Sequence, residues 1–197
     1  MQHRRLWFAL SLVVLAAALP LSASQFMQLP FDQVVRDSTY IVHGSVTNVY
    51  SAWDDAHETI FSYATIQVKN YIGETTGPDV LMVREVGGTV GGYTQQAIGF
   101  PELREGEEVV LMLTRWDDSN DLRINAYNQG KFLVRAFDGV ETLVEDPVKQ
   151  GDDRLGTHGP RMQVEPLSPQ SLLTMDEFVQ MVGAARAARG FTPLHRE

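Results

Sequence analysis

The alternation of apolar and polar residues in Thr59–Asn70 constrains the fold of this chain more than any other feature. The apolar positions of this segment are Ile60, Ala64, Ile66 and Val68. The polar positions between them include Thr59, Thr65, Gln67 and Lys69. A period of two residues is typical of a β-strand with one buried and one solvent-facing side. The segment therefore predicts a sheet that covers a core on one face.

Further strands are expected along the same half of the chain. Their ranges are Tyr40–Tyr50, Val80–Val86, Glu108–Thr114, Leu122–Tyr127, Gly130–Phe137 and Glu141–Val144. Gly44 lies inside the first of these strands and indicates a bulge or a sharp bend. The segments on either side of Asn128 are expected to form a hairpin with each other. The run Val109–Leu113 is apolar without interruption, which predicts cover on both of its faces.

Two helices are expected, one before the strands and one after them. Phe31–Asp37 is short, and Val34 and Val35 are its inward candidates. Near the C-terminus, Thr174 and Glu177 have the spacing of a capping box. The apolar stripe expected on that helix comprises Phe178, Met181, Val182, Ala185 and Ala188. A stripe of this kind must be buried, and the second face of Val109–Leu113 is the expected partner.

The order of these elements predicts the fold class. No helical crossover separates the strands, so a parallel α/β sheet is disfavoured. The expectation is a mainly β fold, with a small antiparallel barrel of about five to six strands and a helix packed on it. A β-sandwich is the alternative.

The first 24 residues have the pattern of a secretory signal peptide. Arg4 and Arg5 precede the apolar run Leu6–Leu19, and the small residues of Ser22–Ser24 suit a cleavage site. The apolar run is shorter than the ~20 residues that span a bilayer, so no stable membrane insertion is expected after cleavage. The pattern predicts a secreted or periplasmic protein that begins near Gln25.

Charge and cysteine content exclude several classes of function. The formal net charge is −9, and it becomes −11 when the leader with its two arginines is removed. Such a chain repels phosphate backbones, so nucleic-acid binding is not expected. The chain contains no cysteine, which excludes thiol nucleophiles and thiolate metal sites.

The expected organisation is a single barrel domain with an added helix. The ranges are a leader at 1–24, a barrel at 25–145, a loop or linker rich in Asp, Gly and Pro at 146–167, a helix at 168–190 and a tail at 191–197. About 170 residues are enough to bury a sizeable core without disulfides.

Several strand motifs together resemble a known family. They are Tyr40–Val46, Tyr63–Val68, Tyr71–Gly73, Val83–Gly88 and Gly106–Leu111. Their order resembles the OB-type barrel of the netrin-like family, which includes the tissue inhibitors of metalloproteases, and is most similar to its cysteine-free bacterial exported members. The resemblance covers about residues 34–134 and implies a five-stranded OB-like barrel with flanking helices. In the animal inhibitors an N-terminal cysteine binds the target's zinc, and this chain has no cysteine to which that role transfers.

Two loops that follow strands share a pattern of Trp before paired Asp residues. Exposed Trp side chains dominate binding hot spots, and a glycine-rich loop can order on a partner. The candidate partner-binding residues are Trp53, Asp54, Asp55, His57, Gly88, Gly91, Tyr93, Trp116, Asp117 and Asp118. The other interpretation is that each Trp caps an open barrel end while the Asp residues form turns. The expected function is a non-enzymatic binding module for a protein or peptide, with an inhibitor-like role toward an exported protease as its sharpest form.

Two alternatives to a protein-binding module stay open. Asp117, Asp118 and Asp121 are candidates for an irregular calcium site, and a Trp beside carboxylates also suits a carbohydrate. An EF-hand is excluded because Leu122 occupies the place of the required glycine. A hydrolase with His57 as its base is less favoured, because no motif places a nucleophile. No catalytic residue and no cofactor are expected, apart from calcium in the first alternative.

Overall fold

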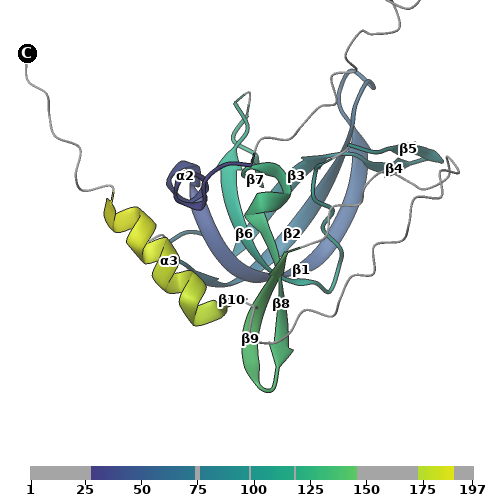
Figure 1. Cartoon of the computed structure of the whole chain (residues 1–197). Helices are drawn as coiled ribbons and strands as arrows, with labels where there is room; N and C mark the ends of the chain where they lie inside the picture. The colour runs from purple at the N-terminus through teal and green to yellow at the C-terminus, as the bar shows by residue number, and fades with distance from the viewer. Residues whose placement is uncertain (1–27, 74–75, 98, 118, 146–172, 189–197) are drawn as a thin grey trace, which may run out of the picture.

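A computed structural model describes residues 28–73, 76–97, 99–117, 119–145 and 173–188 of the chain. Its centre is a closed barrel of five strands, in which β1 pairs with both β2 and β6 (Figure 1). The barrel strands are β1 (Tyr40–Trp53), β2 (Ile60–Tyr71), β3 (Val80–Val86), β7 (Leu122–Ile124) and β6 (Glu108–Arg115). Closure of the sheet confirms the expected barrel and rules out the sandwich alternative.

The remaining elements extend or cover this barrel. Strands β8 (Lys131–Phe137), β9 (Val140–Glu145) and β10 (Leu173–Thr174) continue the sheet beyond β6. A separate hairpin consists of β4 (Gly88–Val90) and β5 (Tyr93–Gln95). The helices are α2 (Phe31–Asp37), the 3-10 turn η1 (Tyr127–Gly130) and α3 (Met175–Ala187). In the described residues, no helix is long and apolar enough to cross a membrane.

The bend expected at Gly44 is present in β1. The register between β1 and β2 shifts between His43 and Gly44, and again between Val46 and Asn48. A Cβ atom at Gly44 would lie 2.6 Å from the carbonyl oxygen of Gln67, so no larger residue fits there without movement of the backbone. These irregularities let β1 curve far enough to pair with β6 along its first half and with β2 along most of its length.

The prediction that the segments on either side of Asn128 form a hairpin with each other is wrong. Strands β7 and β8 do not pair with each other. Both pair antiparallel with the same edge of β6, β7 through Leu113–Arg115 and β8 through Val109–Leu111, while β1 pairs with the other edge. The reason is that the 3-10 turn η1 carries the chain onward along β6 instead of folding it back, and the backbone N–H of Asn125 still donates to the carbonyl oxygen of Met112 on β6 at 2.7 Å. The other edge of β7 meets β3 in a parallel pairing at Val83 and Leu122, so the barrel is mixed rather than purely antiparallel.

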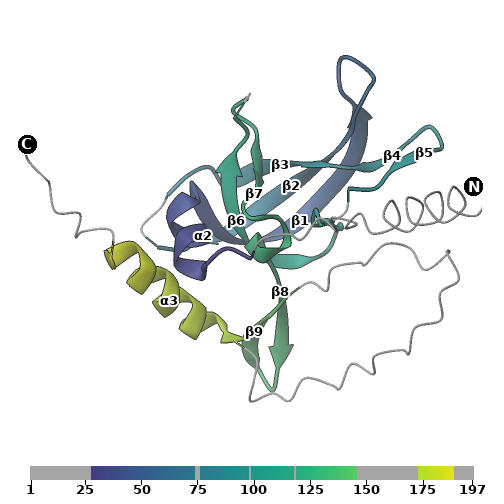
Figure 2. The ribbon, with the colours of Figure 1, turned by 45° about the horizontal axis from the view of Figure 1, so that its top comes forward.

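The continuous apolar run in β6 has cover on both faces, as expected. Val109, Leu111 and Leu113 point into the barrel core. Val110 and Met112 point outward into a second core that both helices cover. Figure 2 shows α2 and α3 together on this side of the barrel. Phe178 on α3 is fully buried there, with its ring centroid 5.4 Å from that of Phe132.

Helix α3 begins with the expected capping box. The Thr174 side chain accepts a hydrogen bond from the backbone N–H of Glu177, and the Glu177 side chain accepts one from the backbone of Thr174. The expected apolar stripe is too wide, because Met181 is 42 % exposed and Ala188 is exposed as well. The buried stripe is Phe178, Val182 and Ala185. A single contact with a curved sheet buries only this i, i+4, i+7 row.

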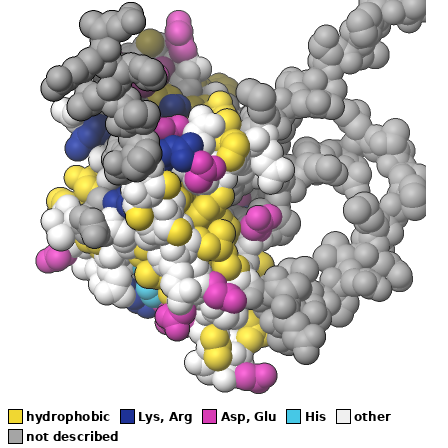
Figure 3. Space-filling view, turned by 60° about the vertical axis from the view of Figure 1, so that its left-hand side comes forward, with side chains coloured by type: hydrophobic (Ala, Val, Ile, Leu, Met, Phe, Trp, Pro, Cys, Tyr) yellow, Lys and Arg dark blue, Asp and Glu magenta, His cyan; other side chains and the backbone are white. Residues whose placement is uncertain are grey.

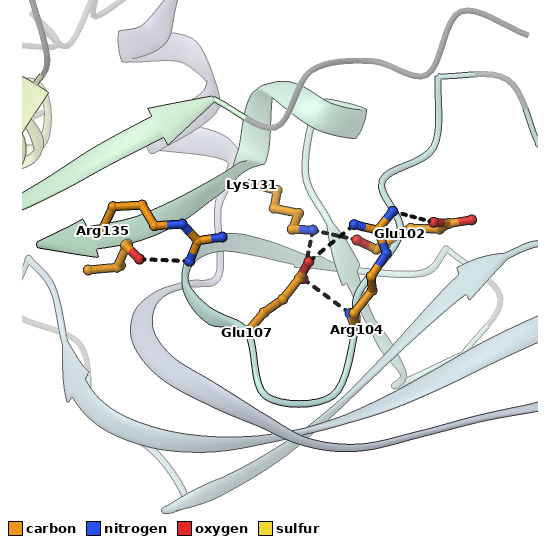
Figure 4. A network of polar contacts seen from close by, with 6 residues as sticks. Glu102, Arg104, Glu107, Lys131 and Arg135 are labelled. Carbon is orange, nitrogen blue, oxygen red and sulfur yellow. Dashed lines mark hydrogen bonds and ion pairs between the residues drawn. The ribbon is translucent and has the colours of Figure 1, made fainter. Parts of the chain in front are cut away.

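A buried lysine lies at the start of β8. Lys131 is 0 % exposed, and its ammonium donates to Glu107 at 2.9 Å and to the carbonyl oxygen of Glu102. Arg104 pairs with Glu102 at 2.8 Å, and its backbone N–H also donates to Glu107 (Figure 4). Every charge in this group faces an opposite charge or a carbonyl, which is what allows a lysine to be buried.

Candidate partner-binding site

Strand β1 continues three residues beyond its expected end, which places Trp53 on the sheet rather than in the following loop. Trp53 lies opposite Ile60 in the register of β1 and β2. The short turn between them is held by Asp54, whose carboxylate accepts the backbone N–H groups of Glu58 at 2.8 Å and Thr59 at 3.2 Å. The hydrogen bond from Glu58 is the main reason why the pKa of Asp54 lies below its usual value, and the hydrogen bond from Thr59 acts in the same direction. The Asp54 carboxylate therefore stabilises the turn, whereas Asp55 is exposed to solvent.

Two of the sequence candidates contact Trp53 directly. The His57 ring stacks on the indole with the centroids 6.3 Å apart, and its backbone has a left-handed φ of 56°. Tyr93 on β5 meets the same indole edge-on at 6.0 Å and is 69 % exposed. Trp53, His57 and Tyr93 are called the inner aromatic group below. It joins the turn of the β1–β2 hairpin to the β4–β5 hairpin, and Tyr93 is more than 30 residues from both Trp53 and His57 in the sequence.

The glycine-rich segment Gly87–Gly92 was expected to be a loop, but it forms part of the β4–β5 hairpin. Gly91 lies in its turn with a φ of 56° and nothing near its Cβ position. At Gly88 the hairpin crosses closely over β1 and β2. A Cβ atom there would lie 2.3 Å from the Ser51 hydroxyl oxygen and 2.5 Å from that of Ser62. Gly88 thus permits the approach that brings Tyr93 to Trp53. Figure 1 shows this hairpin beside the β1–β2 turn.

Trp116 lies on the other side of the β1–β2 hairpin. Its indole meets Phe61 edge-on at 6.0 Å, and its ring N–H donates to the carbonyl oxygen of Arg84 at 3.0 Å. Phe61 lies opposite Ala52, next to the Trp53–Ile60 pair, and neighbouring residues of a strand point to opposite faces. The two tryptophans are therefore near each other in the sheet but belong to two different surfaces.

Two arginines contact the Trp116 ring. The guanidinium of Arg84 is 5.0 Å from the ring centroid of Trp116 and 4.7 Å from that of Phe61. The guanidinium of Arg123 is 4.8 Å from Trp116. Phe61, Arg84, Trp116 and Arg123 are called the outer aromatic group. Cation–π contacts of this kind hold an aromatic ring in a defined orientation.

The sequence alone did not single out the tyrosines that extend this outer surface. Tyr50 and Tyr63 lie opposite each other and stack with centroids 5.1 Å apart. Tyr50 is 46 % exposed, and Met82 on the same face of β3 is 50 % exposed. The signal was present in the sequence, because a strand with aromatic residues on its outward positions is expected to use them at an interface.

A polar row lies on the inner face, beneath the β4–β5 hairpin. Ser51, Ser62 and Glu85 lie opposite one another on β1, β2 and β3. The Ser62 hydroxyl donates to the carbonyl oxygen of Gly87, and Glu85 accepts the backbone N–H of Ile124. Burial raises the pKa of Glu85 to about 8, although the Ile124 N–H and the nearby Arg123 act in the opposite direction. Glu85 therefore carries a proton at neutral pH.

The residues considered for calcium binding, Asp117, Asp118 and Asp121, have different surroundings. The Asp121 carboxylate forms an ion pair with Arg84 at 2.9 Å, so a cation is already present beside it. Asp117 is exposed, and Asp118 lies outside the described residues. Within the described ranges, one group of three potential metal ligands converges, and it consists of His43, Glu108 and Glu141. His43 lies ten residues before Trp53 on β1, away from the aromatic groups.

The arrangement around Trp53 suits recognition more than acid–base chemistry. Asp54, three residues before His57, accepts hydrogen bonds from the backbone rather than orienting the imidazole. What the two surfaces offer instead is large aromatic area with polar atoms at its edges, which is typical of binding anchors. No protein-family model matches this chain, and no curated protein is similar enough in sequence to place it in a family.

Proposed function

We propose that this chain is an exported, non-enzymatic binding module whose partner is a protein or peptide. The observation that carries the proposal is the inner aromatic group, in which Trp53 meets His57 and Tyr93 from two separate hairpins. Tyr93 leaves most of its surface in solvent. Aromatic side chains that are held in place but stay exposed are the usual anchors of protein interfaces.

The outer face of β1, β2 and β3 supports the same proposal. Tyr50, Met82 and Val80 expose about half of their surface on this face. Several large apolar side chains exposed on one face of a sheet are typical of an interaction site. The helices pack instead on the second core around Val110 and Met112. A partner that spans both sides of the β1–β2 hairpin would contact the inner and the outer aromatic group together.

The leader sequence supports a location outside the cytoplasm, and the resemblance to netrin-like barrels suggests a class of partner. The signal pattern of the first 24 residues directs the domain out of the cytoplasm. The resemblance suggests a partner among exported proteases, which the domain would inhibit without the zinc-binding cysteine of the animal inhibitors.

A carbohydrate ligand is the second candidate. The observation that favours it is Trp116, whose ring is held on the guanidinium groups of Arg84 and Arg123. A flat, fixed aromatic ring beside polar groups can stack on a sugar. This candidate predicts that glycans stabilise the protein against heat, because a ligand that binds only the native state raises the unfolding midpoint.

The test compares capture of partners by the wild type and by three variants. The folded proteins are immobilised and exposed to the extracytoplasmic fraction of the cells that produce them, and bound proteins are identified by mass spectrometry. Trp53→Ala and Tyr93→Ala are expected to weaken capture of the specific partner by about tenfold or more. Phe137→Ala removes an aromatic residue on β8 that is 43 % exposed and is expected to have no effect.

The outcomes separate the candidate functions. Partners captured equally by all four proteins would contradict a site at Trp53. No captured protein, together with a glycan-dependent rise in the unfolding midpoint that Trp116→Ala abolishes, would support the carbohydrate candidate instead. An exported protease among the specific partners would then be assayed for inhibition by the purified domain.

A further inference from the structure

Three potential metal ligands from three different strands converge on the outer side of the barrel. His43 belongs to β1, Glu108 begins β6 and Glu141 belongs to β9. Their ligand atoms all lie within 4.8 Å of one another. In Figure 3 a histidine side chain is visible next to acidic and basic side chains near the lower edge of the molecule.

The sheet register explains why these side chains meet. His43 lies opposite Val110, and Ser45 lies opposite Glu108, so His43 and Glu108 are diagonal neighbours on one face of the sheet. Glu141 lies opposite Ala136 on β8, whose side chain is small. Ligands mounted on paired strands are held more rigidly than ligands on loops, which favours a defined coordination geometry.

The burial of the imidazole distinguishes this group from an ordinary acidic surface cluster. His43 is 5 % exposed, and its Nε2 atom lies 2.7 Å from Oε1 of Glu108. Donor atoms that share a tetrahedral Zn²⁺ ion at about 2.0–2.2 Å from the metal lie roughly 3.3 Å apart. A separation of about half an ångström more would therefore admit a metal ion between the two side chains.

We propose that His43, Glu108 and Glu141 bind a divalent transition-metal ion, with Zn²⁺ as the probe. One imidazole nitrogen and two carboxylate oxygens form a mixed ligand set that suits Zn²⁺, Mn²⁺ or Co²⁺ better than Cu⁺ or Ca²⁺. Three protein ligands leave a further coordination position open to water or to a partner's side chain.

Lys69 is the competitor of the metal at this site. Its ammonium donates to the same Oε1 atom of Glu108 that contacts His43. A bound cation must therefore displace this ion pair or share the oxygen with it, which lowers the affinity. Lys69 is exposed and is expected to swing into solvent when the metal binds.

The test measures Zn²⁺ binding to the full chain after treatment with a chelator. Isothermal titration is expected to show one site per chain, and Co²⁺ in place of Zn²⁺ is expected to give visible d–d absorption. Glu141→Gln keeps the size of the side chain and is expected to weaken binding by at least about tenfold. Glu145→Gln is the matched control, since Glu145 is an exposed residue on the same strand and the same side.

Two further variants separate a metal site from a simple ion pair. Lys69→Gln is expected to tighten Zn²⁺ binding, because it removes the competing ammonium. His43→Ala is expected to abolish the Co²⁺ absorption, and circular dichroism checks that the variant is folded. Absence of Zn²⁺ binding, or equal binding by the wild type and by Glu141→Gln, would overturn the proposal. Because the site is remote from Trp53, its failure would leave the proposed partner-binding surface untouched.

Discussion

At the scale of single residues, the buried Glu85 makes the stability of the protein depend on pH. Burial raises its pKa from 4.5 to about 8, so the folded protein holds a proton that the unfolded chain releases. The contribution of Glu85 to the free energy of unfolding is therefore fully present below pH 4.5 and is lost as the pH rises toward 8, with a slope that approaches about 1.4 kcal/mol per pH unit. Glu85→Gln keeps an oxygen for the Ile124 N–H and carries no charge. We expect urea unfolding to show that this variant is the more stable protein at about pH 8 and differs little from the wild type at about pH 5.

The control for Glu85 is Glu145→Gln, which removes an exposed carboxylate and is expected to leave the pH profile unchanged. A Glu85→Gln protein that is less stable than the wild type at every pH would mean that the carboxylate itself is needed. The same residue illustrates a limit of sequence reasoning. Glu85 stands in the expected strand Val80–Val86, but only the register with Ser62 and the contact with Ile124 show that it faces inward.

At the scale of elements, α3 depends on its packing more than on its intrinsic helix propensity. Gly183 lies in the middle of this helix, is exposed and has nothing near its Cβ position. Glycine in a helix interior is about 0.5–1 kcal/mol less favourable than alanine. We expect Gly183→Ala to raise the free energy of unfolding by about that amount, measured by urea denaturation.

Gly73 provides the opposite case for the same substitution. Its φ is +75°, and a Cβ atom would lie 2.8 Å from a methyl group of Val182 on α3. Gly73→Ala is therefore expected to destabilise the protein. Stabilisation by both substitutions would show that α3 does not pack on this turn as described. The capping box at Thr174 was predictable because it depends on residues three apart, whereas the close approach at Gly73 depends on a helix more than 100 residues away.

At the scale of the whole molecule, one side chain joins the two helices to the barrel. The Phe178 ring lies 5.7 Å from that of Phe31 on α2 and 5.4 Å from that of Phe132 on β8. Phe178→Ala is expected to lower the free energy of unfolding by about 3–5 kcal/mol. Met181→Ala, on the exposed side of the same helix, is expected to have little effect. Unfolding of the wild type should follow one transition by both far-UV circular dichroism and tryptophan fluorescence.

Two separate transitions in the wild type, one for the helix and one for the barrel, would contradict a single cooperative unit. So would equal effects of Phe178→Ala and Met181→Ala. The sequence placed both residues on one apolar stripe, because a hydrophobic pattern shows which residues prefer burial but not how much surface the partner covers. The curved outer face of β6 and β8 covers only the row that contains Phe178.

Local patterns determined the strands, the helix ends and the inward positions of this chain, because each depends on neighbours within a few residues. The alternation in Thr59–Asn70, the bend at Gly44 and the capping box at Thr174 are of this kind. Tertiary structure alone decided that β7 and β8 share one edge of β6, that Trp53 and Trp116 face opposite sides, and that His43 meets Glu108 and Glu141. These arrangements depend on strand register and barrel closure, where a shift of one residue turns every side chain to the other face.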